Sequence, residues 1–448
     1  MASTFPLPRD LGNNLVLRWA TPKDIDAIVS FNAKIHSDHG PDKPDERVGA
    51  WTRDLMGGGH PTCRAGDFTV VEDIASGEIV SSLNLISQTW SYEGIPFKVG
   101  RPELVGTLPE YRNRGLVRAQ FDAIHAVSAE RGEMVQAITG IPYYYRIFGY
   151  EMALDLGGGR AGFLPQIPKL KEGEREPYHL RPAVETDLPW MADLSAQGAA
   201  RSPIRCLRDE SQWKYELLGT CEMNVNRSEF RIIETPAGEA VGYLAHPPFT
   251  WGTMMVAQGY EVKSDVSWAA VTPSVIRYLQ ATGVAYPNAF GENEPFEAFG
   301  FWLGAEHPVY RVIPDRLPRI RPPYAFYMRV PDLPTFLHHI APALEKRLAD
   351  SLLAGYTGEV RVTFYRGGLR LGFENGRLIK AEDYQPAPVG HEGEAAFPER
   401  TFLQVLFGRR SLEELRYMFA DCWTNNEDTA VLLDTLFPRR ASNVWPFS

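Results

Sequence analysis

The stretch that decides the fold is residues 101–150, RPELVGTLPEYRNRGLVRAQFDAIHAVSAERGEMVQAITGIPYYYRIFGY. Its first eight residues predict a strand that is irregular near Gly106 and ends at Pro109, because proline cannot continue a strand ladder. A short loop follows, and then an amphipathic helix to about Arg131. MVQAITGI (134–141) predicts the next strand. The order is therefore strand, basic loop, helix and strand.

The loop and the helix N-terminus have the composition of a phosphate-binding site. Gly115 lets the backbone approach a ligand closely. Successive N–H groups and the positive end of the helix dipole favour an anion there. Taken alone, the R-x-x-G-x-V pattern also fits a basic turn before an ordinary helix. The aromatic run YYRIFGY (144–150) after the next strand makes the phosphate site the favoured interpretation.

Together these elements resemble the GNAT superfamily of N-acetyltransferases, over about residues 15–155. The resemblance implies that acetyl-CoA binds at the strand edge, the helix N-terminus and the end of the next strand, and that its acetyl group passes directly to an amine without a metal. The third position of the loop motif, Val117, departs from the glycine or alanine of the family. The implied acetyl-CoA-binding residues are Val105, Gly106, Thr107, Arg112, Asn113, Arg114, Gly115, Leu116, Val117, Arg118, Gly140 and Ile141.

The resemblance also implies that Tyr145 is the general acid. A phenol with a pKa of about 10 can protonate a leaving thiolate whose conjugate acid has a pKa of about 8.5, and a modest local shift would bring the two values together. Core packing is the alternative for this tyrosine, and more so for Tyr143 and Tyr144 beside it.

An internal repeat extends the prediction beyond this stretch. Six positions near the start of the chain recur at the same spacing, and an F-G-aromatic triplet closes each copy, at 148–150 and 299–301. We therefore expect two tandem α/β copies over about 15–310. The six matched pairs are Leu17/Leu180, Arg18/Arg181, Ala20/Ala183, Asp24/Asp187, Ile25/Leu188 and Ile28/Met191.

The second copy lacks the chemical groups of the first. Alignment of the closing triplets puts Phe296 opposite Tyr145, and VTPSVIRYL (271–279), which has no glycine, opposite the phosphate loop. We expect this copy to be structural.

The remaining residues, about 323–448, have a different pattern. Residues 331–353 predict one helix, and Asn375-Gly376 predicts a two-residue hairpin between strands. Over its full length the chain resembles the enhanced-intracellular-survival family, which has two GNAT domains and a sterol-carrier-like domain. We expect a mixed α+β and α/β fold with domains at 1–160, 161–318 and 319–448. The family resemblance also implies a homo-oligomer, perhaps a hexamer.

In that family the C-terminal carboxylate is the general base, which here would belong to Ser448. The family pattern ends in an aromatic residue, whereas Phe447 is penultimate here. A frayed terminus is the alternative, since chain ends are poorly ordered by default.

The loop and helix at 36–61 are expected to cover the acceptor. Asp38 and Trp51 could bind a cationic amine through charge and a cation–π contact, while a solvated loop is the simpler interpretation. The acceptor class would be aminoglycoside-like compounds, polyamines or lysine. The alternative function is a non-catalytic ligand-binding or scaffold protein with a vestigial acetyltransferase domain.

Composition excludes several other classes. The net charge of −10, from 46 basic and 56 acidic residues, argues against a nucleic-acid binder. No apolar run reaches the roughly 18 residues of a membrane span, and no secretory signal is evident. The four widely separated cysteines lack metal-ligand spacing and are typical of a reducing cytoplasm.

Overall fold

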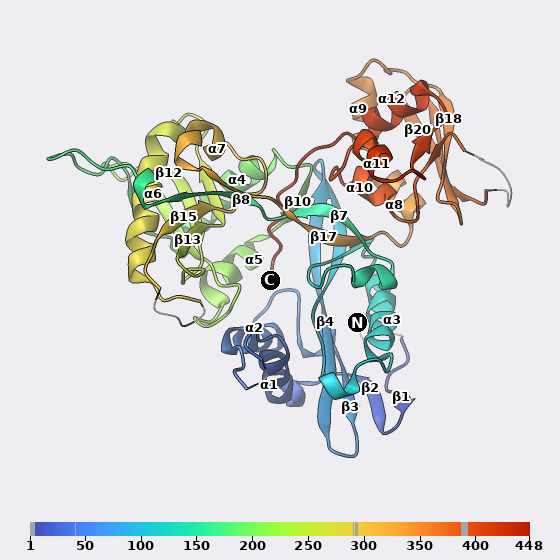
Figure 1. Ribbon diagram of the computed structural model, residues 1–448, viewed down its shortest axis with the longest axis horizontal. Coiled ribbons are helices and arrows are strands. Elements are labelled where there is room, and N and C mark those ends of the chain that lie inside the picture. Colours follow the sequence, from blue (N-terminus) through green and yellow to red (C-terminus); the bar gives the residue numbers. More distant parts are fainter. Residues whose placement is uncertain (1–4, 41, 290, 292–293, 387–392) are drawn as a thin grey trace.

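The computed structural model describes residues 5–40, 42–289, 291, 294–386 and 393–448. We call residues 1–160, 161–318 and 319–448 the first, second and third segments. Figure 1 shows the first segment below, the second on the left and the third at the upper right. The C-terminus lies in the middle of the molecule, between the first and second segments.

The largest sheet has nine strands, in the order β1-β2-β3-β4-β5-β6-β17-β7, with β10 added beside β4. It is built mainly from the first segment. Its strands are β1 (Arg9–Gly12), β2 (Leu15–Trp19), β3 (Phe68–Asp73), β4 (Glu78–Tyr92), β5 (Ile95–Thr107), β6 (Val135–Ile138), β7 (Glu151–Leu156), β10 (Ile204–Leu207) and β17 (Tyr324–Arg329).

Two of these strands come from the other segments. Strand β10 pairs antiparallel with the end of β4, and β17 lies between β6 and β7 and pairs antiparallel with both. The predicted boundaries at 160 and 318 therefore do not separate the sheets, and the domain division stays a prediction. Helices α1 (Ile25–Ile35) and α2 (Glu46–Met56) lie on one side of β4, and α3 (Leu116–Glu130) lies on the other (Figure 1).

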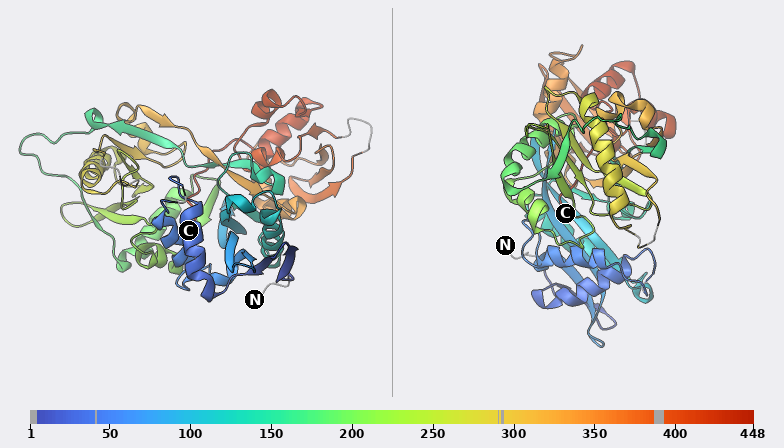
Figure 2. Two further views of the ribbon diagram at one scale, coloured as in Figure 1. Left: turned by 60° about the horizontal axis from the view of Figure 1, so that its bottom comes forward. Right: turned by 90° about the vertical axis from the view of Figure 1, so that its left-hand side faces the viewer.

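The second segment forms most of two four-stranded sheets, β14-β12-β11-β9 and β13-β15-β8-β16, with β8 beginning in the first segment and β16 lying at the start of the third. Figure 2 shows them as a lobe of their own beside the first segment. The strands are β8 (Gly159–Phe163), β9 (His179–Pro182), β11 (Glu229–Glu234), β12 (Ala240–His246), β13 (Met254–Ala257), β14 (Gly259–Val262), β15 (Ala298–Phe301) and β16 (Arg319–Arg321). The helices are α4 (Leu188–Ala199), α5 (Glu210–Lys214), α6 (Trp268–Ala285) and α7 (Val309–Val312).

The repeat is visible as one ion-pair pattern used twice. In the first copy Arg18 bridges Asp24 at 2.7 Å and Glu72 at 2.7 Å. In the second copy Arg181 bridges Asp187 at 2.6 Å and Glu234 at 2.7 Å. Each arginine thus joins the start of its first helix to the neighbouring strand. The predicted α+β class with tandem GNAT-like units is confirmed.

The third segment has a five-stranded sheet, β20-β19-β18-β21-β22. The predicted hairpin is confirmed, since Asn375 (φ 49°) and Gly376 (φ 78°) join β19 to β20 with two left-handed residues. The strands are β18 (Gly358–Thr363), β19 (Gly368–Glu374), β20 (Arg377–Tyr384), β21 (Ala395–Ala396) and β22 (Trp423–Thr424).

The prediction of a single helix over 331–353 is wrong, because the chain forms two shorter helices there that meet at Ile340. Pro342, in the first turn of the second helix, has no N–H to extend the first. The helices of the segment are α8 (Leu333–His339), α9 (Ala341–Ala349), α10 (Phe402–Leu406), α11 (Leu412–Met418) and α12 (Glu427–Leu436).

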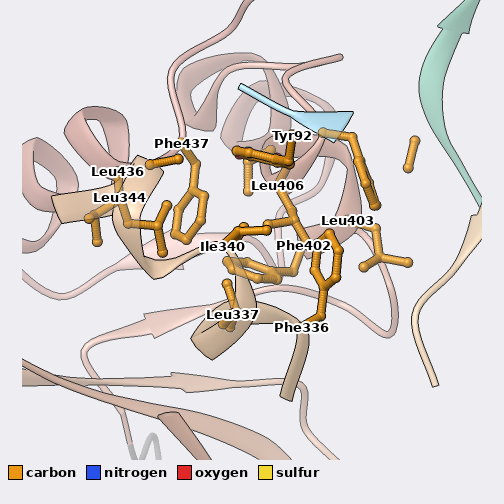
Figure 3. Close-up of a cluster of buried hydrophobic side chains, with 14 of the residues drawn as sticks. Tyr92, Phe336, Leu337, Ile340, Leu344, Phe402, Leu403, Leu406, Leu436 and Phe437 are labelled. Carbon is orange, nitrogen blue, oxygen red and sulfur yellow. The ribbon is translucent and has the colours of Figure 1, made fainter. Parts of the chain in front are cut away.

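The first and third segments share a hydrophobic core. Tyr92, at the end of β4, is fully enclosed by side chains of the third segment (Figure 3). Its hydroxyl donates to the carbonyl of Leu406 at 2.8 Å and accepts from Arg347 at 3.1 Å. Phe336 packs edge-on against Tyr92 and Phe97, with ring centroids 6.3 and 5.3 Å apart. The two segments are therefore expected to unfold together.

Replacement of Phe336 by alanine should lower the free energy of unfolding by about 3–5 kcal/mol, the usual cost of deleting a buried ring. Urea unfolding followed by tryptophan fluorescence measures this loss. Leu352→Ala is the control, because Leu352 is fully exposed and its truncation should cost less than about 0.5 kcal/mol. Two separate transitions in the wild type would contradict the shared core.

Candidate active site

The site begins where β5 and β6 separate. The two strands pair in parallel only at Val99 with Val135 and at Gly100 with Gln136. Beyond this point β6 continues against β17, while β5 continues against β4. Leu104 has a φ of 53°, and the β4–β5 register shifts beside it. The irregularity predicted near Gly106 is thus present as a bulge two residues earlier, and it opens a V-shaped edge.

Helix α3 follows β5 along the chain and begins with no side-chain cap. Gly115 is its N-cap residue, with a left-handed φ of 77°. The first turn of a helix leaves its N–H groups without helical partners, so those of Leu116, Val117 and Arg118 are available to a ligand. Gly132 ends the helix with a φ of 68°, as the sequence predicts. An uncapped N-terminus beside an open strand edge suits an anionic ligand.

The three arginines of the loop are held in different ways. Arg112 donates to the carbonyl of Thr107 at 3.3 Å. Arg114 donates to the carbonyl of Glu110 at 2.9 Å and lies over the ring of Tyr111. Arg118 lies over the ring of Phe148, 5.4 Å from its centroid. All three arginines, and Asn113 between the first two, are exposed. The loop is therefore positively charged and open to solvent.

The strand residues expected to bind acetyl-CoA have structural partners as well. A Cβ on Gly106 would come within 2.7 Å of Ile35, so the glycine lets α1 pack against β5. The carbonyl of Gly106 accepts from Ser81, and the Thr107 hydroxyl lies 2.8 Å from the same serine oxygen. Val105 is half-buried. Their part in acetyl-CoA binding stays a prediction.

Tyr145 lies at the end of the V, in a 3-10 helix that runs to Phe148. Gly140 lies beside the phenol, where a Cβ would be in ordinary contact 3.4 Å from the hydroxyl, and its φ of 131° is a backbone conformation that favours glycine. The ring packs at 5.4 Å from Tyr327 of β17, and the Tyr327 hydroxyl donates to the carbonyl of Ile141 at 3.2 Å. The structure thus brings Gly140, Ile141 and Tyr145 together and adds Tyr327, which the sequence did not predict.

The surroundings of Tyr145 shift its pKa in the direction opposite to the one expected. Burial raises the pKa of the phenol above its usual value, and the carboxylate of Glu103 raises it further. At neutral pH the hydroxyl is therefore protonated and available as a donor. Burial raises the pKa of a thiol in the same way, so a leaving thiolate in this site would also become more basic.

The last residues of the chain enter the same region. Arg101 of β5 donates to the carbonyl of Phe447 at 3.2 Å and to the hydroxyl of Ser448 at 2.7 Å. Gln88 of β4 also donates to the Phe447 carbonyl. The Phe447 ring is fully buried against His60 and Tyr215, at 4.8 and 5.8 Å between centroids. The terminus is therefore held in place and is not frayed.

A buried ion pair on β5 holds the arginine that contacts the C-terminal residues. The guanidinium of Arg101 lies 2.7 Å from a carboxylate oxygen of Glu103, and both side chains are buried. Burial raises the pKa of Glu103. The sequence analysis missed both residues, although charges at positions i and i+2 of an apolar strand, on one face, could have indicated them.

A cavity of about 200 Å³ adjoins Ser448. Its wall comes from all three segments. Glu216 contributes an acidic side chain, and Ser448 contributes the chain terminus. The lining residues are Arg101, Thr139, Leu156, Gly157, Glu216, Thr220, Asn226, Ser228, Phe326, Val444, Trp445, Pro446 and Ser448.

The two residues expected to bind the acceptor do not line this cavity. Trp51 is buried in the core between α1, α2 and the sheet, and Asp38 is exposed in the turn after α1. A ring enclosed by core side chains has no free face for a cation, so the position of Trp51 fits core packing better. The cavity beside Ser448 is the better candidate for the acceptor.

Two alignments of the second copy are corrected by its topology. Residues 271–279 lie inside α6 and not before it, so the counterpart of the phosphate loop is 263–267, KSDVS. Strand β15 pairs in parallel with β13, as β6 does with β5, and the short helix α7 follows. Tyr310 in α7, and not Phe296, therefore stands opposite Tyr145. Its hydroxyl donates to the carbonyls of Phe301 and Gly304, which leaves it a structural role.

Within the part of the chain that the structure describes, no group of three or more His, Cys, Asp or Glu side chains could hold a metal ion. None of the described helices is long and apolar enough to cross a membrane.

Comparison with known proteins agrees with this geometry. Residues 17–153 match the sequence family of the acetyltransferase (GNAT) domain. Residues 17–153 therefore form a GNAT acetyltransferase domain, the domain type of N-acetyltransferase enzymes. No curated protein matches the sequence significantly.

Solved structures share the fold over nearly the whole chain. GCN5-related N-acetyltransferases from Anabaena variabilis ATCC 29413 and Kribbella flavida superpose with TM-scores of 0.63 and 0.61, at 14% and 16% identity. Each match covers 96% of this chain and 99% or 97% of the other. Eis1 from Mycobacterium abscessus gives a TM-score of 0.57 at 13% identity, over 96% and 99% of the two chains. At these identities the likeness establishes the fold.

Gly115→Ala should weaken coenzyme A binding without a steric clash inside the protein. A left-handed φ costs a non-glycine residue about 1–2 kcal/mol, so the variant should move the N–H groups that face the ligand. Gly132→Ala is the matched control at the other end of α3, since neither position has any atom within 4 Å of a new Cβ. Titration calorimetry with coenzyme A should show a higher Kd for the first variant only. Equal effects would contradict the site.

The unfolding free energy should fall in acid because of His60. Burial lowers its pKa to about 4 from 6.5, so between these values the unfolded chain takes up a proton that the folded chain does not. The contribution of the neutral His60 to the unfolding free energy is fully present above pH 6.5. It falls as the pH is lowered toward 4, by up to about 1.4 kcal/mol per pH unit. Urea unfolding at pH 7, 6 and 5 should show a shallower pH dependence for His60→Phe. Identical slopes would rule out this contribution.

Proposed function

We propose that the protein transfers the acetyl group of acetyl-CoA directly to a primary amine of a polar, cationic acceptor. The observation that carries this proposal is one arrangement around β5. An uncapped helix α3 follows β5, the buried phenol of Tyr145 feels the charge of Glu103 on β5, and Arg101 of β5 holds Ser448.

The residues present fit the phosphates of acetyl-CoA. Leu116, Val117 and Arg118 would offer backbone N–H groups, and Arg112 and Arg114 would supply charge. Bound acetyl-CoA supplies the acetyl group as an activated thioester. The free edge of β5 would offer backbone groups to its pantetheine arm, as far as the bulge at Leu104.

Tyr145 would act as the general acid. Because its pKa is raised, it keeps its proton until a strongly basic group forms beside it. The hydroxyl would hydrogen-bond to the departing sulfur and transfer its proton there. Glu103 disfavours the phenolate through its charge, and Tyr327 fixes the ring and the backbone of Ile141.

The carboxyl group of Ser448 would act as the general base that deprotonates the attacking ammonium. Arg101 positions it through the Phe447 carbonyl and the Ser448 hydroxyl. Glu103 is the second carboxylate in the region, but its bond to Arg101 makes it a positioning residue. The amine would enter through the cavity beside Ser448, whose wall includes Glu216, a carboxylate paired with Arg208. This cavity is smaller than the about 300–1,000 Å³ of typical ligand pockets, so it would hold only the amine-bearing end of an acceptor.

The second and third segments would support this site. The second segment supplies Glu216 and β10, and the third supplies β17 and the terminal residues. The sterol-carrier likeness of the third segment, the homo-oligomer or hexamer and the cytoplasmic location stay predictions. A non-catalytic scaffold remains the rival, and turnover of any amine distinguishes the two.

Tyr145→Phe should lower kcat by about 10²–10⁴ and leave the Kd of acetyl-CoA unchanged, because only the proton donor is lost. Thiol release from acetyl-CoA, with a panel of aminoglycosides, polyamines, lysine peptides and arylamines, measures this rate. Tyr144→Phe is the matched control, an adjacent half-buried tyrosine that should retain activity. Equal rates for the wild type and Tyr145→Phe would remove Tyr145 from the mechanism.

A two-residue extension after Ser448 should abolish turnover while acetyl-CoA still binds, because it converts the Ser448 carboxylate into a peptide carbonyl and moves the terminal charge two residues further along the chain. Ser448→Ala is the control, since it keeps the carboxylate and the bonds of Arg101 and Gln88 to the Phe447 carbonyl and loses only the hydroxyl contact. The variant should retain most of kcat. Normal kcat in the extended protein would exclude the terminal carboxylate as the base.

A further inference from the structure

The second segment has a cleft that corresponds to the acetyl-CoA cleft of the first. Strand β13 pairs with β15 up to Ala257 and Phe301, and then the chain breaks at Gln258 and continues as β14 against β12. This is the same separation that β5 makes from β6. A cavity of about 540 Å³ occupies the region, and it is the larger of the two cavities described here.

The residues that bind phosphate in the first copy are missing from this cleft. The loop before α6 has only five residues, 263–267, and no glycine. Its counterpart before α3 runs from 108 to 115 and contains the left-handed Gly115. The second cleft therefore has no room for the same pyrophosphate loop. Yet the space has not been filled by side chains.

In the second copy the large and the small residue of one helix–strand contact have changed places, and the large residue on the strand is a carboxylate that lies in the wall of the cleft. In the first copy Ile35 of α1 packs on Gly106 of β5. In the second copy Gly198, at the position equivalent to Ile35, packs on Glu261 of β14. Glu261 is buried and paired with Arg201 at 2.5 Å. Burial lowers the pKa of the neighbouring His307, which is consistent with a neutral imidazole at pH 7.

The wall has an excess of positive charge. It contains four arginines against two carboxylates, those of Glu261 and the exposed Glu306. Arg201 is paired with Glu261. Arg208 is paired with Glu216, which lies outside this cavity. The two remaining arginines, Arg205 and Arg311, have no carboxylate partner within the described parts of the chain.

Arg205 donates to the hydroxyl of Ser91 at 3.1 Å and to the carbonyl of Ala196 at 3.0 Å, which are neutral groups. Arg311 of α7 is exposed. Both guanidinium groups are free to neutralise a ligand. Leu303, Val312 and the partly exposed ring of Trp445 add apolar surface.

We propose that this cavity is a second binding site, for a small molecule that joins an anionic group, a carboxylate or a phosphate monoester, to an apolar body. Its volume lies within the about 300–1,000 Å³ that is usual for ligand pockets. Arg311 and Arg205 bind the anionic group, and Trp445, Leu303 and Val312 contact the apolar body. The site does not depend on the acetyl-transfer function.

The test is titration calorimetry on the full chain with phenyl phosphate, benzoate and neutral benzyl alcohol. Saturating coenzyme A is present throughout, so that phosphate binding at α3 is blocked. Phenyl phosphate and benzoate should each bind once per chain, and benzyl alcohol should not. Arg311→Gln should weaken the binding of the anions about tenfold, the loss expected for one charged hydrogen bond.

Arg319→Gln is the matched control, an exposed arginine of β16 that does not line the cavity. It should bind like the wild type. Ala305→Trp, which places a bulky ring in the wall, should block binding of both anions while the thermal midpoint stays unchanged. Equal affinities for Arg311→Gln and Arg319→Gln would overturn the proposal. So would anions that bind no more tightly than benzyl alcohol.

Discussion

The buried guanidinium of Arg101 is the constraint on which the active region depends. A charge removed from water is tolerated only if it is paired and hydrogen-bonded, and Arg101 finds its partners in Glu103 and in residues 447–448. Departure of the terminal segment would leave Arg101 with the Glu103 carboxylate but without the bonds to the chain end. One side chain therefore links the tyrosine end of the cleft to the terminal end, across segments that are more than 300 residues apart in the chain.

Local patterns gave the elements of the first cleft correctly, because glycine, proline and amphipathic spacing act on neighbouring residues. The bulge in β5, helix α3 between Gly115 and Gly132, and the Asn375-Gly376 hairpin were all predictable. The Arg101–Glu103 pair and Tyr327 were not, since their partners come from strands and ends that meet only in the folded chain. The position of Trp51 could not be predicted for a similar reason. An aromatic residue beside a predicted loop can bind a ligand or pack in the core, and in the folded chain Trp51 is buried in the core.

The two copies share the features that serve the fold and differ at the proposed phosphate loop. The bridges of Arg18 and Arg181 occur in both copies because each joins a carboxylate at a helix start to a carboxylate on the neighbouring strand and so serves the fold. The phosphate loop has shortened, and the hydroxyl of Tyr310 has turned to backbone carbonyls. The separation of the strands is present in both copies. A cavity is left where the first copy has its cleft.

The place of β17 between β6 and β7 bears on biosynthesis. Both flanking strands emerge from the ribosome well before residues 324–329, by roughly ten seconds or more at about 5–20 residues per second. During that interval the nascent first segment has two strand edges with no neighbour between them, and unpaired edges are prone to associate with other chains. The intervening second segment must be made before the gap can close. Translation speed and chaperone binding over this interval thus become determinants of how much protein reaches the native state.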